Sequence, residues 1–216
     1  MKKYTIVCFG DSNTWGFDSP NCDRYPEEVR WTGRLQSILG DEYKVIEEGL
    51  CGRNIATEDP AEGEKSGMTT LVPVMESQMP FDLFVIMLGT NDTKRKFAYS
   101  ARDIQGCMEQ MLMKALSFIR FKMNDSAKIL LVAPAPIHEA IKGSFYGDMF
   151  QYERSRELSL ALPELFKELA DRYQIEFFDA GTVATADPFD GIHLNPDGHA
   201  KLACALAKKI VEIKKK

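Results

Sequence analysis

The sequence predicts an α/β fold, a three-layer α/β/α sandwich with a five-stranded parallel sheet of flavodoxin-like order 2-1-3-4-5. Two observations carry this prediction. Short apolar runs alternate with longer amphipathic runs along the chain, and the polar motifs fall just after the apolar runs. Five strands favour an open, doubly wound sheet over a closed barrel. Because 216 residues suit one domain, we expect a single domain over residues 1–216.

Five apolar segments are predicted to form the strands. The first follows the N-terminal lysines and ends directly before a polar motif. The third, residues 83–88, is apolar on both faces, which is typical of a central parallel strand covered by helices on both sides. The five segments are residues 4–9, 43–47, 83–88, 128–133 and 176–179.

Five amphipathic segments between or after these strands are predicted to form helices. In residues 103–122, apolar side chains recur at helical spacing from Ile104 through Met108 and Met111. The last helix follows Asn195, which can cap it, and Pro196, which suits a first turn. The five segments are residues 27–39, 69–79, 103–122, 151–173 and 197–213.

Two connections are unusually long for a compact domain, which is typical of lids, pocket walls or contact surfaces. Residues 55–67 are acidic and interrupted by glycine and proline. Residues 134–150 mix proline and glycine with Phe145, Tyr146 and Phe150, so we expect this segment to form a pocket wall or an oligomer contact.

The composition indicates a cytoplasmic protein. A formal net charge of −5 argues against a nucleic-acid partner, which would require a basic face. The five cysteines are odd in number and lack CxxC spacing, as expected of reduced thiols. The apolar run after Lys2 and Lys3 is too short for a signal sequence, and no stretch approaches the ~18–20 apolar residues of a membrane span.

Three side chains from opposite ends of the chain have the chemistry of an acyl-transfer site. Ser12 follows the first strand and can serve as the nucleophile. His193 can take its proton and later give it to the leaving alcohol. Asp190, three residues earlier, can orient the imidazole and stabilise its charged form.

Such a site also needs hydrogen-bond donors aimed at the oxyanion that forms during the reaction. Gly52 follows the second strand, and its backbone amide can approach a ligand closely. Asn91 follows the third strand and offers a carboxamide. With the backbone amide of Ser12, these groups make three candidate donors for an oxyanion hole.

These motifs resemble the blocks of the SGNH (GDSL) hydrolase superfamily. The blocks are Gly10-Asp-Ser12, Gly52, Gly89-Thr-Asn91-Asp92 and Asp190-x-x-His193. Residues 10–16 with 45–50 and Arg53 are similar to its arylesterase and acyltransferase branch. The resemblance implies a serine esterase with Ser12, Asp190 and His193 as catalytic triad, and with Ser12, Gly52 and Asn91 as oxyanion hole. It also implies small esters as substrates, no metal, no cofactor and a homo-oligomer. Asn13 departs from the motif, where leucine or isoleucine often stands, which concerns the shape of the acyl pocket.

Two further residues are candidates for substrate binding, each with a structural alternative. Trp15 can line the pocket, or it can pack against the helix that starts near Glu27. Arg53 can attract a substrate carboxylate, or it can form an ion pair with Glu47 or Glu48.

A second hypothesis comes from a different class of protein. A flavodoxin-like module without hydrolase activity could bind the phosphate of FMN with residues 12–14 at a helix N-terminus. This hypothesis gives no role to Asn91, Asp190 or His193.

Overall fold

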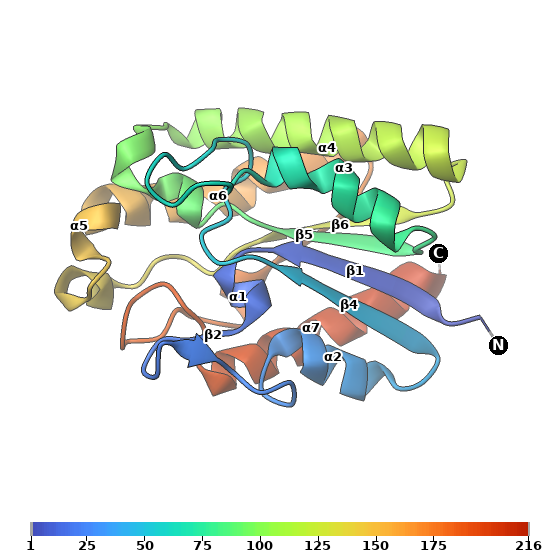
Figure 1. Ribbon diagram of the computed structural model, residues 1–216, viewed down its shortest axis with the longest axis horizontal. Helices are drawn as coiled ribbons and strands as arrows, with labels where there is room; N and C mark the ends of the chain where they lie inside the picture. The colour runs from blue at the N-terminus through green and yellow to red at the C-terminus, as the bar shows by residue number, and fades with distance from the viewer. Residues whose placement is uncertain (1, 216) are drawn as a thin grey trace.

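The computed structural model describes residues 2–215 and contains one sheet of five strands (Figure 1). The strands are β1 (Tyr4–Gly10), β4 (Tyr43–Gly49), β5 (Leu83–Met87), β6 (Lys128–Ala133) and β7 (Glu176–Asp179). Their order is β4-β1-β5-β6-β7, and each neighbouring pair is parallel. Counted along the chain, this order is 2-1-3-4-5. The predicted fold class and strand order are confirmed.

Helices cover both faces of the sheet and complete the three layers (Figure 1). One face carries α3 (Gly67–Gln78), α4 (Ala101–Met123) and α6 (Tyr152–Tyr173), and the other carries α2 (Trp31–Leu39) and α7 (Pro196–Lys215). All of these except α2 begin and end within two residues of the predicted bounds. Within residues 2–215, no helix combines the length and the apolar character that crossing a bilayer requires.

The core consists of two apolar layers, one on each face of the sheet. In β1, Val7 and Phe9 pack into the layer under α3, α4 and α6, whereas Ile6 and Cys8 pack into the layer under α2 and α7. Successive strand residues point to opposite faces, and here both faces are covered, so all four side chains are buried. This explains why the strands are continuous apolar runs in the sequence.

The helix predicted over residues 27–39 begins later, at Trp31. Arg30 has an extended backbone (φ −59°, ψ 140°), and its guanidinium binds the Glu47 carboxylate at the end of β4. The preceding residues form a turn closed by hydrogen bonds to the Pro26 carbonyl. The helix therefore begins directly after a buried arginine whose side chain is ion-paired to β4.

The two long connections contain structure of their own. Residues 134–150 include the 3-10 turn η3 (Glu139–Gly143) and the short helix α5 (Gly147–Phe150). They form a third, small apolar cluster together with the loop that precedes α7. Its buried members are Ile137, Ile141, Phe150 and Ile192. Residues 55–67 lie against the turn that follows β5.

Candidate active site

The turn after β1 presents Ser12 at the carboxyl edge of the sheet. Asp11 caps the short helix α1 (Ser12–Trp15) by accepting a 2.9 Å hydrogen bond from the Asn13 backbone amide. Ser12 is the first residue of this helix and is largely buried. In open parallel sheets, ligands bind beyond this edge.

Ser12, His193 and Asp190 are joined by a continuous chain of hydrogen bonds. His193 Nε2 lies 3.0 Å from Ser12 Oγ, and His193 Nδ1 lies 2.5 Å from Asp190 Oδ2. The other carboxylate oxygen of Asp190 accepts the backbone amides of Ile192 and His193 at 2.9 and 3.0 Å. The carboxylate thus fixes both the imidazole and the loop that carries it.

The charge state of Asp190 follows from these contacts. Burial alone would raise the pKa of its carboxyl group. The hydrogen bonds to His193 and the charge of its imidazolium outweigh burial and lower the pKa to about 2. Asp190 therefore stays ionised at neutral pH and can stabilise a positive charge on the imidazole.

Asn13 joins the two ends of the chain, a role that the sequence analysis missed. Its amide Nδ2 donates to the Ile192 carbonyl at 3.2 Å, and its Oδ1 accepts from the Leu194 amide at 2.9 Å. These two bonds bracket His193 and hold it over Ser12. The partners are about 180 residues apart in the chain, so no local pattern marks them.

The predicted oxyanion donors lie at the same edge. Gly52 has φ +81°, a left-handed conformation that favours glycine, and it lines the same cavity as Ser12 and Asn91. The Asn91 amide Nδ2 donates to the Arg53 carbonyl at 3.2 Å. A carboxamide nitrogen carries two N–H groups, so this bond fixes the side chain and leaves one donor for a ligand.

Asp92 anchors the turn that carries Asn91. The Ile55 amide donates to its two carboxylate oxygens at 3.0 and 3.2 Å. Asp92 is fully buried, and desolvation raises its pKa to about 7. The segment after β4 and the turn after β5, which supply two of the candidate donors, are thereby held together.

A cavity of about 270 Å³ lies over Ser12 and His193. One side is polar and comes from the turns after β1, β4 and β5. The other side is apolar and comes mainly from residues 134–150, as the pocket-wall alternative expects. The polar side includes Asn13, Gly52, Glu62, Thr90, Asn91 and Lys94, and the apolar side includes Phe17, Phe145, Tyr146, Met149, Phe150 and Ile192.

Arg53 does not reach this cavity. It is only 4% exposed and lies beneath the site, where Nη1 donates to the carbonyls of Gly10 and Glu48, the former at 2.7 Å. Its guanidinium stacks 4.1 Å from the centre of the Phe9 ring. Neither expectation for this residue, a substrate contact or an ion pair with Glu47 or Glu48, matches these contacts. The carbonyls at the ends of β1 and β4 bind its Nη1 instead, and its buried Nε has no hydrogen-bond partner among the described residues.

Trp15 also lies outside the residues that line the cavity. Its ring packs against Phe17, with centres 6.4 Å apart, and the Arg24 guanidinium lies 5.1 Å from the ring centre. Trp15 therefore packs against other side chains, as the structural alternative expects. Its partners, however, are Phe17 and Arg24 and not the helix predicted from residue 27. Phe17, two residues further on, lines the cavity in its place.

Within residues 2–215, no group of three or more histidine, cysteine, aspartate or glutamate side chains is arranged to hold a metal ion. A hydroxyl, an imidazole and a carboxylate joined in this order, beside backbone and amide donors, are typical of serine hydrolases. The fold and the site together place the chain in this class.

Comparisons with known proteins agree with this class. The model of the GDSL-like lipase/acylhydrolase family matches residues 8–201. Est24, a carbohydrate acetylesterase from Sinorhizobium meliloti, superposes with a TM-score of 0.90 at 37% identity, over 98% of this chain and 100% of that one. The aryl esterase of M. smegmatis superposes with a TM-score of 0.89 at 33% identity, over 98% and 99% of the two chains.

The chain therefore belongs to the GDSL-like lipase/acylhydrolase family. A curated relative, the acetylxylan esterase of Xylanibacter ruminicola, is 26% identical over 95% of this chain, which spans only 42% of that relative's length. The predicted membership of the SGNH (GDSL) superfamily is confirmed, and the family match also supports the predicted class, carboxylic ester hydrolase. The matches favour this class over the FMN-binding hypothesis.

Proposed function

We propose that the chain is a serine esterase that hydrolyses small carboxylic esters through an acyl-enzyme on Ser12. The observation that carries this proposal is the hydrogen-bond chain from Ser12 Oγ through the His193 imidazole to Asp190 Oδ2. In this proposal Ser12 is the nucleophile, His193 the general base and Asp190 the residue that orients it.

The first half-reaction forms the acyl-enzyme. Ser12 Oγ attacks the ester carbonyl carbon while His193 Nε2 takes the hydroxyl proton. The tetrahedral oxyanion accepts hydrogen bonds from the backbone amides of Ser12 and Gly52 and from the Asn91 carboxamide. When the intermediate collapses, the C–O bond to the alcohol breaks and His193 returns the proton to the leaving oxygen.

The second half-reaction releases the acyl group. A water molecule attacks the acyl carbonyl while His193 takes one of its protons. When the second intermediate collapses, the bond between the acyl carbon and Ser12 Oγ breaks, His193 returns the proton to Oγ, and the carboxylic acid is released. An alcohol that replaces this water would give acyl transfer instead of hydrolysis. We propose that both outcomes are open to this site.

We further propose short-chain esters as the substrates. A cavity of about 270 Å³ holds a small acyl group with part of its alcohol. Two relatives are named for acetyl esters of carbohydrates and a third for aryl esters. The aromatic side chains of residues 134–150 suit an aryl group or a sugar face.

Three broader properties belong to the same proposal. We expect the chain to act as one domain, in the cytoplasm, where its free cysteines stay reduced. We also expect a homo-oligomer, because Phe145 is 91% exposed beside the cavity mouth and Phe121 is 77% exposed on α4. Light scattering of the purified protein tests the last point, and a monomer at all concentrations would contradict it.

The substitution Ser12→Ala tests the proposal. We expect it to lower kcat/KM for p-nitrophenyl acetate by at least about 10³-fold, because no other group replaces the nucleophile. Ser77→Ala is the matched control, since Ser77 is an exposed serine on α3 far from the sheet edge. A Ser12→Ala protein that folds normally and keeps most of the esterase activity of the unmodified protein would refute the proposed function.

A further inference from the structure

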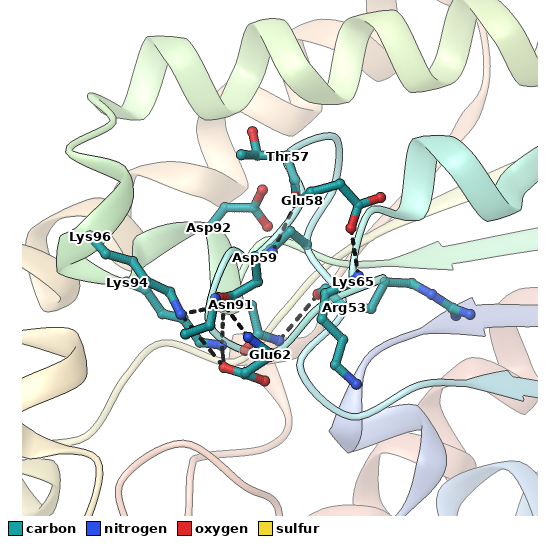
Figure 2. Close-up of polar contacts among 12 residues, drawn as sticks. Arg53, Thr57, Glu58, Asp59, Glu62, Lys65, Asn91, Asp92, Lys94 and Lys96 are labelled. Carbon is teal, nitrogen blue, oxygen red and sulfur yellow. Dashed lines mark hydrogen bonds and ion pairs between the residues drawn. The ribbon is translucent and has the colours of Figure 1, made fainter.

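Four charged side chains fasten residues 55–67 to the turn after β5 beside the cavity. We call Asp59, Glu62, Lys94 and Lys96 the charge cluster. Lys94 Nζ lies 2.5 Å from Glu62 Oε1 and 3.4 Å from Asp59 Oδ2, and Lys96 Nζ forms a short ion pair with Asp59 and lies 3.7 Å from Glu62. Figure 2 shows both lysines reaching toward the two carboxylates.

The members of the charge cluster differ in what they present to the cavity. Glu62 and Lys94 both line it. The side chain of Glu62 is 32% exposed, whereas that of Lys94 is 3% exposed, and its ammonium faces two carboxylates. Asp59 is buried, and neither Asp59 nor Lys96 lines the cavity. Glu62 is therefore the member of the charge cluster that is most exposed toward the cavity, and its carboxylate is paired with the Lys94 ammonium behind it.

Glu62 also lies directly beside the candidate oxyanion hole. A Cβ added to Gly52 would overlap Glu62 Oε2, so the carboxylate occupies the space next to this residue. The Lys65 side chain also approaches Gly52, with Cε 3.4 Å from that Cβ position, but Lys65 does not line the cavity. Arg53 lies beneath the site and is buried. The Glu62 carboxylate therefore lines the cavity next to one of the candidate oxyanion donors.

We propose that Glu62 is a specificity-determining residue that excludes esters with a negative charge close to the scissile bond. The inference rests on the proposed function, since it concerns the substrates of the same site. Like charges repel strongly in a partly desolvated cavity, because the effective dielectric constant there is well below that of water. Lys94 is a positioning residue, because its buried ammonium holds the Glu62 carboxylate at the cavity wall.

A charge series on one ester scaffold tests the proposal. The three probes are 3-acetoxybenzoate, 3-acetoxybenzamide and 3-acetoxyphenyltrimethylammonium, which are anionic, neutral and cationic at pH 7. Each kcat/KM is divided by the second-order rate constant for hydrolysis of the same ester by hydroxide. This corrected value removes differences in leaving-group reactivity. For the unmodified protein we expect about a tenfold lower corrected value for the anionic than for the neutral ester, and the highest value for the cationic ester.

The variant Glu62→Gln keeps the shape of the side chain and removes its charge. We expect it to bring the corrected values of the anionic and neutral esters to within about twofold of each other. Glu64→Gln is the matched control, because Glu64 is exposed in the same segment and outside the cavity. It should keep the ratio of the unmodified protein. An unchanged ratio in Glu62→Gln, or equal values for all three esters with the unmodified protein, would overturn the inference.

A second measurement uses the unmodified protein alone. It therefore still tests the inference if the Glu62→Gln protein fails to fold. Raising the ionic strength from about 0.02 M to 0.5 M screens the Glu62 charge, so the anionic-to-neutral ratio should rise several-fold in the unmodified protein. A ratio independent of salt would contradict the inference. Failure of the proposed function looks different: none of the three esters would be hydrolysed, or Ser12→Ala would hydrolyse them as fast as the unmodified protein.

Discussion

At the scale of single residues, Asn13 shows most clearly how the two ends of the chain are joined at the site. One carboxamide supplies both a donor and an acceptor to the loop around His193. A leucine or isoleucine at this position could form neither bond. The residue that departs from the superfamily motif therefore has a structural role, because it connects the turn that carries Ser12 with the loop that carries His193.

Asn13→Ala should weaken both folding and catalysis. It leaves the buried Leu194 amide and Ile192 carbonyl without partners, which we expect to lower the free energy of unfolding by about 2–4 kcal/mol. It also frees His193 to drift from Ser12, so kcat should fall by at least about tenfold. Urea denaturation and ester kinetics measure the two effects.

Asn21→Ala provides the control, because Asn21 is an exposed asparagine that bonds only to the Asp18 carboxylate. It should behave like the unmodified protein in both measurements. The account of Asn13 would be wrong if Asn13→Ala matched this control.

The same scale shows why the sequence predicted the position of some residues and not of others. Ser12, Asn91 and His193 lie at strand ends or just before the last helix, so the parallel sheet brings them to one edge. Arg53 is adjacent to Gly52 in the chain, yet its side chain turns beneath the site to the carbonyl ends of β1 and β4. Adjacency in sequence does not fix the direction of a side chain.

At the scale of elements, η3 supports the loop that carries His193, the proposed general base. The Gly191 carbonyl accepts from the His138 amide at 2.8 Å. Gly191 has φ +84°, and a Cβ there would lie 2.5 Å from the Ile141 nitrogen and 2.7 Å from the His138 carbonyl oxygen. Only glycine allows this contact between residues 134–150 and the loop before α7.

Gly191→Ala should separate these two elements. Backbone strain and the overlap with η3 should lower the free energy of unfolding by about 2–4 kcal/mol and reduce kcat as His193 shifts. Gly143→Ala is the matched control within the same segment, because a Cβ there meets no atom within 4 Å. Equal thermal and kinetic behaviour of the two variants would refute this role for Gly191.

The helices and strands that the sequence predicted are those with a clear hydrophobic periodicity. The long helices α4 and α6 and all five strands of the sheet have clear patterns, and their bounds were predicted closely. The helices α1 and α5 and the two strands of a small antiparallel ribbon, β2 (Phe17–Asp18) and β3 (Asp23–Arg24), are two to four residues long, too short to show a period. Tertiary contacts define them instead. Residues of α1, β2 and α5 line the cavity, so its shape was the part that sequence could not predict.

At the scale of the whole molecule, buried titratable groups couple folding to pH. His199 on α7 is fully buried and accepts a hydrogen bond from the Trp31 amide at 3.2 Å. Desolvation, together with the charges of His193, Arg34 and Arg30, lowers its pKa to about 3. In the unfolded chain the histidine has an ordinary pKa of about 6.5, so between these two pKa values the unfolded chain binds a proton that the folded chain does not.

The sign of this effect follows from the proton count. The contribution of His199 to stability is present above about pH 6.5 and is lost as the pH falls toward 3. Between pH 7 and 5 it should remove about 2 kcal/mol from the free energy of unfolding. Asp92 and Asp11 oppose it, because burial raises their pKa values to about 7 and about 6. Comparison with a variant of His199 separates the contribution of the histidine to the free energy of unfolding from the contributions of these carboxyl groups.

His199→Asn should show this loss reduced, since asparagine can accept the Trp31 bond and does not titrate. Guanidinium denaturation of both proteins at pH 7 and pH 5 measures the difference. If the two proteins lose the same free energy between these pH values, His199 is not the group responsible.

The most direct test of the central claim is to locate the covalent adduct of a small p-nitrophenyl alkylphosphonate, which mimics the tetrahedral intermediate. We predict one adduct per chain, formed in step with the loss of esterase activity and mapped by peptide mass spectrometry to Ser12. An adduct on another residue that lines the cavity, such as Cys51, or full inactivation with Ser12 unmodified, would contradict the account.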